Sequence, residues 1–346
     1  MSRLWSRAWL YAGHESQVPR PGNRVPVLLA SRPGDLLRHG DGTLGIRLAD
    51  GSAPGAVANH RGFVFARLRT AGTSFVDALG PAIAALDNLA DRAPAGGLEI
   101  TGGCVRTLVR ANWKIYLENI NDTLHAVTAH ESAATAASSV WSRQLPDAPR
   151  PHALQQLLPF GAGYDSYHRM GGRCLPNGHT VLGTAASLHG VLDTPYAYRA
   201  MLEAAHGPAR TADILAFTPQ NAVLYPSLSI KTSPQALRVL RPLGPDRTVV
   251  EAWTFRVRGA PATLLERGLV YNRLVFSPLS VVAHDDLHIF ESIQAALGSQ
   301  PNPWISLQRE HRADEDVAAH GDVSGTSEAL MRHQYRTWLA LMRDPD

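Results

Sequence analysis

The strongest constraint on this chain comes from residues 112–130, where helix-forming residues alternate with an unusual number of polar side chains. Asp122 and His125 are three positions apart, so on a helix they share a face and the carboxylate can accept an imidazole N–H. His125 and His130 are five apart, and a straight helix would turn them about 140° away from each other. The helix predicted over residues 111–136 must therefore break if both imidazoles are to meet.

Two neutral imidazoles that converge could bind a metal ion and leave its other face open for a carboxylate, water or dioxygen. A second helix, predicted over residues 285–297, offers the carboxylate. Apolar residues follow Asp286 by three, four, seven and eleven positions, which places Asp286 on the apolar face and turns Asp285 about 100° toward its edge. A carboxylate directed into a core needs a cationic partner. We therefore predict His125, His130 and Asp286 as the metal ligands, with Asp285 as the main alternative.

Each of these residues also has an ordinary structural interpretation. A single histidine is more often a core or surface residue than a ligand, and Asp286 could pair with one of the many arginines. The combined pattern favours the metal interpretation.

The remaining sequence predicts an α+β fold with an antiparallel sheet packed on helices. Strands are indicated at residues 61–66, 222–225, 237–240 and 249–255, and helices at 74–89 and beyond residue 330. The span 211–257 as a whole has a β pattern. Residues 33–55 are rich in Gly, Pro, Asp and Arg, with one short strand candidate at 43–48, and are too few to form a core of their own. A polar surface loop is expected over residues 310–325.

Composition excludes several classes of protein. The only cysteines, Cys104 and Cys174, lie in no CxxC or CxH pair, so neither a disulfide framework nor a cysteine-rich metal centre is expected. The net charge is only +3 and the basic residues are scattered, so no nucleic-acid partner is predicted. No apolar run approaches the ~20 residues that span a bilayer, and no signal peptide is apparent, so we expect a cytoplasmic protein without membrane contact.

Two motifs carry a family resemblance. The run NWK-x3-EN-x2-D-x2-H-x4-H from Asn112 to His130, and D-x4-E-x2-Q from Asp286 to Gln294, resemble signatures of the Rieske-type aromatic ring-hydroxylating oxygenase α-subunits. Shorter similarities at residues 9–15, 61–65, 221–226 and 241–243 extend the resemblance over most of the chain. Leu124 departs from the aromatic residue that often precedes the first histidine.

The resemblance implies a helix-grip catalytic domain in which His125, His130 and Asp286 bind a mononuclear non-haem Fe(II). Asp122 matches a catalytic acid that links this iron to the Rieske histidine of a neighbouring subunit. The expected substrates are a small aromatic compound and O2, as in the catabolism of aromatic compounds. Two electrons would arrive from a reductase or ferredoxin. A homotrimer, with or without a β-subunit, is implied as well.

One part of the family pattern is missing. The family binds a [2Fe-2S] Rieske cluster through CxH and CxxH pairs, and this sequence contains neither. We therefore divide the chain into residues 1–68, an N-terminal segment with the remnant of a Rieske domain, and residues 69–346, the catalytic domain. The break is expected near residues 31–37, because residues 38–44 resemble the family sequence that follows the second pair.

The leading hypothesis is an oxidoreductase, a mono- or dioxygenase α-subunit whose electrons come from outside this chain, so that turnover by the chain alone is not expected. One alternative is a non-catalytic ligand-binding protein or a degenerate, truncated homologue. Another is a sequence read from an incomplete frame. Iron content after reconstitution separates the enzyme from the non-catalytic protein.

Overall fold

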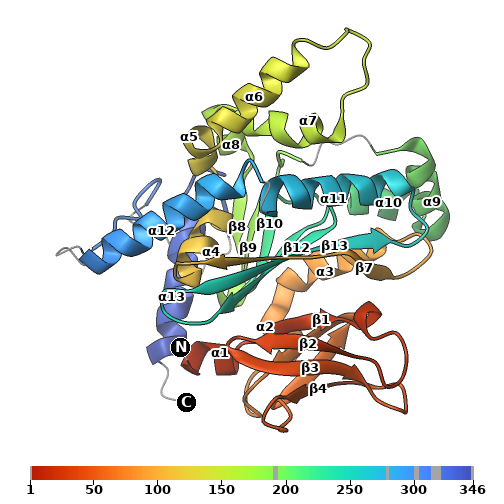
Figure 1. Ribbon diagram of the computed structural model, residues 1–346, viewed down its shortest axis with the longest axis vertical. Coiled ribbons are helices and arrows are strands. Elements are labelled where there is room, and N and C mark those ends of the chain that lie inside the picture. Colours follow the sequence, from red (N-terminus) through yellow and green to blue (C-terminus); the bar gives the residue numbers. More distant parts are fainter. Residues whose placement is uncertain (1, 190–193, 278–279, 300–303, 313–320, 344–346) are drawn as a thin grey trace.

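The computed structural model describes residues 2–189, 194–277, 280–299, 304–312 and 321–343 (Figure 1). Three antiparallel sheets form its framework. The first has the order β1-β6-β5: Leu10–His14, Phe63–Arg67 and Ala56–His60. The second has the order β2-β3-β4: Arg24–Leu29, Arg32–Arg38 and Leu44–Leu48.

The third sheet has eight strands in the order β14-β8-β9-β10-β11-β12-β13-β7. Their bounds in that order are Asp322–Val323, Gly172–Cys174, Thr180–Leu182, Asn221–Leu224, Leu228–Lys231, Ala236–Pro242, Thr248–Val257 and Leu98–Val109. The strands predicted at residues 222–225, 237–240 and 249–255 are therefore confirmed.

The helices surround this large sheet (Figure 1). They are α1 Ser2–Arg7, α2 Phe75–Leu79, α3 Ala84–Asp91, α4 Trp113–Asn121, α5 His125–Ala129, α6 Glu131–Trp141, α7 His152–Leu157, α8 Tyr164–Arg169, α9 Tyr196–His206, α10 Pro208–Ala216, α11 Ala262–Phe276, α12 Ala283–Ser299 and α13 Ala329–Arg343. Short 3-10 turns complete the list: η1 Glu15–Gln17, η2 Gly80–Ile83, η3 Leu158–Gly161 and η4 Pro176–Gly178.

Alternation along the central strands divides their side chains between two layers. Ile230, Leu237 and Val239 pack in one core with residues of α2 and α3. On the other side, Ala236 and Ala252 pack in a second core with residues of α11. The sheet is thus buried on both faces, and a polar side chain that points to either face needs a local explanation.

The N-terminal region holds more β structure than expected. The strand predicted at residues 43–48 is present as β4, whereas the bounds of β2 and β3 were not predicted. Pro26 lies in β2, an edge strand of its sheet, where a missing N–H need not interrupt a ladder. Leu29 pairs with Arg32, so β2 and β3 are joined by a two-residue loop. The predicted break near residues 31–37 falls on this hairpin.

Side chains from this region do not form a separate core. Leu29, Leu36, Ile46 and Leu48 are buried in one cluster that also contains residues of α1, α4, β10, β12, β13 and α12. The ring of Trp5 meets that of Trp113 edge-on, with centroids 5.1 Å apart. The N-terminal strands β2, β3 and β4 and the large sheet therefore stabilise each other.

The helix predicted over residues 111–136 is broken, as the histidine spacing required. It consists of α4, α5 and α6, and His130 stands between α5 and α6 with φ −108° and ψ 12°. The first break, at residues 122–124, was not expected. Asp122 there has extended backbone, and its side chain accepts a hydrogen bond from the backbone N–H of His125 at 2.7 Å.

Other expectations need correction. The helical pattern at 74–89 is interrupted, because Pro81 and Gly80 produce the 3-10 turn between α2 and α3. Residues 208–216 form α10 and not the β structure predicted from position 211. The C-terminal helix is confirmed as α13, whereas residues 313–320 of the expected polar loop lie outside the described residues. No helix among the described residues is both long and apolar enough to cross a membrane.

Candidate metal centre

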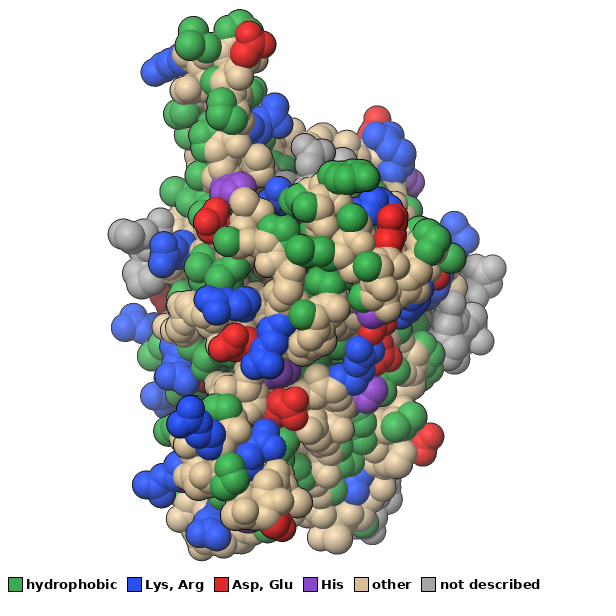
Figure 2. Space-filling model, turned by 90° about the vertical axis from the view of Figure 1, so that its right-hand side faces the viewer, with side chains coloured by type: hydrophobic (Ala, Val, Ile, Leu, Met, Phe, Trp, Pro, Cys, Tyr) green, Lys and Arg blue, Asp and Glu red, His purple; other side chains and the backbone are tan. Residues whose placement is uncertain are grey.

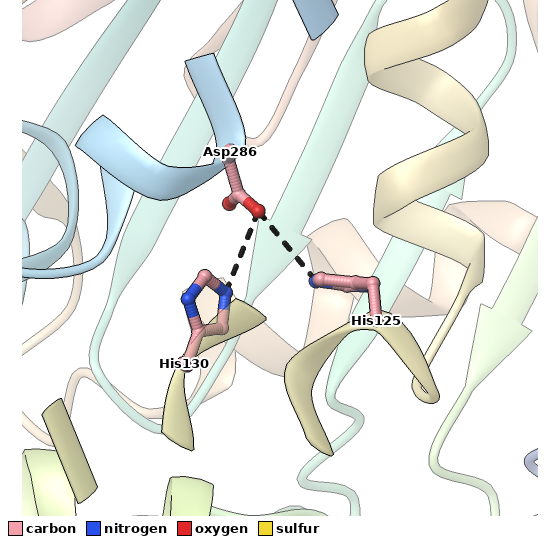
Figure 3. Close-up of side chains that lie close together, drawn as sticks. All are labelled: His125, His130 and Asp286. Carbon is pink, nitrogen blue, oxygen red and sulfur yellow. Dashed lines mark ion pairs between the residues drawn. The ribbon is translucent and has the colours of Figure 1, made fainter. Parts of the chain in front are cut away.

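His125, His130 and Asp286 converge at one point, although the acid is more than 150 positions from the histidines (Figure 3). The Nε2 atom of His130 lies 3.5 Å from Oδ1 of Asp286, and Nε2 of His125 lies 3.9 Å from the same oxygen. One ligand atom from each residue falls within 4.8 Å of the other two. Among the described residues this is the one group of three or more His, Cys, Asp or Glu with such spacing.

Neighbouring polar groups hold the three side chains in place. The Nδ1 atom of His125 lies 3.0 Å from Oδ2 of Asp122, so the other ring nitrogen is turned toward Asp286. The other oxygen of Asp122 accepts a hydrogen bond from Arg309 at 2.5 Å. The amide of Asn119, on α4, donates to Oδ1 of Asp286 at 3.2 Å. Asn119 therefore holds the acid of α12 against the helix that precedes the histidines.

Burial and charge shape the ionisation of this group. Burial raises the pKa of Asp286, and the two histidines only partly offset that effect. Burial lowers the pKa of His130, against the influence of Asp286. Burial also acts to raise the pKa of Asp122, but hydrogen bonds from His125 and the charge of Arg309 hold it below its ordinary value. The environment thus favours a neutral imidazole at His130 and an ionised Asp122, while the charges of the described residues, Arg238 included, do not fully offset the burial of Asp286.

Of the two acids of α12, the structure turns Asp286 toward both histidines, although the apolar face used to predict its direction is only partly buried. Asp286 faces both histidines, and its side chain is 17% exposed against 37% for Asp285. Of the apolar positions used to define the buried face, only Phe290 is buried; Ile289, Ile293 and Leu297 are 38–42% exposed. Asp285 lies 3.6 Å from Nδ1 of His130, on the side away from the meeting point.

The D-x4-E-x2-Q motif has a structural use as well. The side-chain carbonyl of Gln294 accepts a hydrogen bond from the backbone N–H of Asn112 at 2.9 Å, immediately before α4 begins. Asn112 itself caps α4 by accepting from the N–H of Lys114 at 3.1 Å. The two motifs therefore fix the relative position of the helices that carry the acid and the histidines.

The three side chains open onto a pocket that encloses about 530 Å³ of space, counting the part open to solvent. Its apolar wall is formed mainly by residues of η3, α8 and α11 and by the segments next to them: Phe160, Tyr167, Met170, Leu188, Tyr271, Val275, Phe276 and Val282. Tyr116 borders an adjacent small cavity, and Phe276 lines both.

Sequence analysis missed several polar residues of the pocket and its margin. Asn119, Lys231 and Arg238 line it, and Arg309 reaches Asp122 from a segment far along the chain. Lys231 and Arg238 could have been noticed in the sequence, because each is a charged residue among apolar residues in the span 211–257, which has a β pattern. Arg309 had no such signal, since it lies outside any regular element.

Replacing Asp122 with asparagine is expected to weaken metal binding about 10–100-fold without removing the site. The amide cannot stabilise the His125 ring as the carboxylate does, and it loses the ion pair with Arg309. The measurement is a competitive Fe(II) titration against a chromophoric chelator under anaerobic conditions. Asp87→Asn is the matched control. Asp87 forms a similar pair with His60, with 2.7 Å between the carboxylate oxygen and the ring nitrogen, and neither residue lines the pocket. Equal affinities for both variants would remove Asp122 from any role in positioning His125.

Comparisons with known proteins agree with this picture. A family model described as the ring hydroxylating alpha subunit (catalytic domain) matches residues 90–344. The chain is 26% identical to the anthranilate 1,2-dioxygenase large subunit of Acinetobacter baylyi over 411 aligned positions, covering 99% of this chain and 86% of the relative. It is 23% identical to the biphenyl dioxygenase subunit alpha of Paraburkholderia xenovorans, covering 100% of this chain and 88% of the relative.

Among solved structures, the naphthalene 1,2-dioxygenase of Rhodococcus sp. bound to indole aligns with a TM-score of 0.74 at 19% identity, covering 99% of this chain and 91% of the other. This likeness confirms the predicted α+β helix-grip fold. The family model covers most of the chain, so the chain belongs to the ring-hydroxylating oxygenase α-subunits, a family of iron-dependent oxidoreductases.

Proposed function

We propose that the chain carries out the O2-dependent hydroxylation of a small aromatic substrate at one Fe(II) ion held by His125, His130 and Asp286. The observation that carries this proposal is the convergence of the three ligand atoms beside an apolar pocket. A two-histidine, one-carboxylate set with open positions is the donor set typical of non-haem Fe(II) oxygenases.

The donor set fits such an ion. Two ligands about 2.1 Å from one metal and at right angles to each other are about 3 Å apart. The separations of 3.5 and 3.9 Å from Asp286 to the two imidazoles are only slightly larger. The buried carboxylate that lacks a sufficient cation would gain one, and His130 would bind as the neutral form that burial favours.

Bound Fe(II) would supply the site at which O2 is activated. The protein supplies the rest. Asp122 orients the His125 ring, and Asn119 holds the Asp286 carboxylate. The apolar wall binds the aromatic ring beside the site and excludes water from it. We also propose Asp122 as the acid through which electrons enter, in which case Arg309, now bound to its outer oxygen, is the contact that an electron donor would have to displace.

The two electrons needed for oxygen insertion are proposed to come from another chain. The sequence has no CxH or CxxH pair for a [2Fe-2S] cluster. The alignment with the anthranilate enzyme runs over more positions than this chain has residues, so part of that relative has no counterpart here. A cluster-binding segment absent between β2 and β3 is consistent with their two-residue connection. On this proposal residues 1–68 are the remnant of a Rieske domain and residues 69–346 the catalytic domain.

The partners proposed on the same basis are a ferredoxin or reductase that supplies electrons, and further copies of the chain in a trimer, with or without a β-subunit. The face shown in Figure 2 carries both acidic and basic side chains among apolar and uncharged ones.

Anaerobic reconstitution with ferrous ion tests the proposal. We expect about one iron per chain in the wild type and almost none in His125→Ala, measured by metal analysis after desalting. His60→Ala is the matched control, because His60 is also paired with an aspartate but lies away from the pocket. Wild-type protein that is folded but retains no iron would contradict the proposal and favour the non-catalytic ligand-binding alternative.

A further inference from the structure

Two buried cations form the wall of the pocket that is contributed by the large sheet. Lys231 ends β11 and Arg238 lies in β12, and both line the pocket together with Asp286. The strands pair so that Arg238 is opposite Ser229 and Lys231 is opposite Ala236. Side chains of alternate residues share a face, so both cations project from the same face of the sheet. Lys231 is 5% and Arg238 7% exposed.

Lys231 has no anionic partner in the part of the chain that the structure describes. Among the described residues, no hydrogen bond or ion pair to its ammonium group is found, and its closest identified contact is the ring of Tyr271, 5.4 Å from Nζ to the ring centre. The chain contains only one other lysine, Lys114, and uses arginine for its remaining basic residues. A buried lysine is therefore exceptional in this sequence as well as costly.

The partners of Arg238 are mostly uncharged. It donates to the side chains of Asn221 and Ser229, and its guanidinium lies 5.2 Å from the ring centre of Phe276. The one carboxylate on which its charge acts is Asp286, whose negative charge would be shared with the metal and two imidazoles. Burial, and secondarily the charge of Arg238, lowers the pKa of Lys231 far below its ordinary range.

Other buried cations of this chain are satisfied within the protein, which makes the contrast informative. Arg241 pairs with Glu251 and donates to the backbone carbonyl of Tyr11 at 2.6 Å. Arg92 donates to the carbonyls of Ile214 and Phe217, at 2.9 and 3.0 Å. A structural role for Lys231 would require comparable contacts, and the described residues provide none. What Lys231 lacks, among the described residues, is an anion on the pocket side.

We propose that the substrate is an aromatic carboxylate, whose carboxylate group pairs with Lys231 and Arg238 while its ring lies against Phe160, Tyr271 and Phe276. This inference rests on the proposed function and adds the substrate class. The names of the relatives do not decide it, because anthranilate carries a carboxylate and biphenyl does not. A carboxylate held by the two cations would also fix the orientation of the ring relative to the metal ligands, and so restrict the positions open to hydroxylation.

Calorimetric titration with benzoate and with benzamide, its uncharged counterpart of similar shape, tests the inference. We expect benzoate to bind at least about tenfold more tightly than benzamide, as a hydrogen-bonded charge pair predicts. Acetate, which has the charge without the ring, should bind far more weakly than benzoate. Each titration is made on the metal-free and the Fe(II)-loaded protein, so that loss of the iron site and loss of carboxylate recognition give different results.

The decisive variant is Lys231→Met, which keeps the length of the side chain and removes its charge. It should lower benzoate affinity at least about tenfold and leave benzamide affinity unchanged, whereas Lys231→Arg should keep most of the preference. Lys114→Met, the matched control, should bind both ligands as the wild type does. The melting temperature of ligand-free Lys231→Met should equal or exceed that of the wild type, because a buried amine without a hydrogen-bond partner among the described residues is removed.

Three results would overturn the inference: benzamide binding as tightly as benzoate, no detectable binding of benzoate to folded protein, or an unchanged preference in Lys231→Met. A large fall in the melting temperature of Lys231→Met, with loss of both ligands, would likewise assign Lys231 a structural role.

Discussion

Asp286→Ala is expected to abolish stoichiometric iron binding, whereas Asp285→Ala is expected to retain about one iron per chain at saturating metal. Among the described residues, Asp286 supplies the carboxylate oxygen that lies within 4.8 Å of ligand nitrogens from both histidines. Two imidazoles alone bind ferrous ion weakly, since a hard carboxylate ligand is then replaced by water. Asp285 lies near Nδ1 of His130, the ring nitrogen that points away from Asp286. Its removal should therefore weaken the affinity for iron but leave the stoichiometry at about one iron per chain.

The two variants form a matched pair, because the residues are adjacent in the first turn of α12 and differ mainly in direction. Anaerobic titration with metal analysis gives stoichiometry, and the circular dichroism spectrum establishes that both variants are folded. Asp286→Ala should also gain stability in the metal-free state, since it removes a buried carboxylate whose pKa is raised by burial. If Asp285→Ala loses iron and Asp286→Ala keeps it, Asp285 is the ligand and our assignment of Asp286 is wrong.

The candidate site could be predicted from sequence because its signals are local. The five-residue spacing of His125 and His130 required a break in the helix, and Asp122 lay one turn from the first of them. The direction of Asp286 was harder to predict. The apolar stripe used for it is largely exposed beyond Phe290, so the helix face was inferred from residues that do not pack in the described structure. The resemblance of the D-x4-E-x2-Q run to a family motif pointed to the same acid independently of that stripe.

Long-range contacts were beyond the sequence. Arg309 meets Asp122 and Lys231 shares a pocket with Asp286 only because of the tertiary fold. The β2–β3 hairpin was hidden for a different reason, because prolines normally mark the end of a strand and Pro26 lies in an edge strand. Residues 33–55 are too few to form a core of their own. The sequence did not reveal that their strands instead contribute to a core built largely by other elements.

The second prediction with a large expected effect concerns the core that the N-terminal strands share with the large sheet. Leu36→Ala is expected to lower the free energy of unfolding of the whole protein by about 2–5 kcal/mol. Leu36 is completely buried in the cluster that also contains Trp113, Ile115 and Phe290. A cavity at this position removes contacts from the N-terminal strands and from the two helices that carry metal-site residues. Urea denaturation followed by tryptophan fluorescence measures the change.

The control is Leu243→Ala, the same substitution at a leucine that is 43% exposed, which should change stability by less than about 0.5 kcal/mol. Iron release during thermal unfolding gives a second measurement. If the N-terminal strands and the metal site belong to one cooperative unit, Leu36→Ala lowers the midpoints of iron release and of fluorescence change together. If Leu36→Ala instead produces an early fluorescence transition while iron release stays at the wild-type temperature, residues 24–48 unfold independently. The small N-terminal sheet would then be an appendage and not a support of the site.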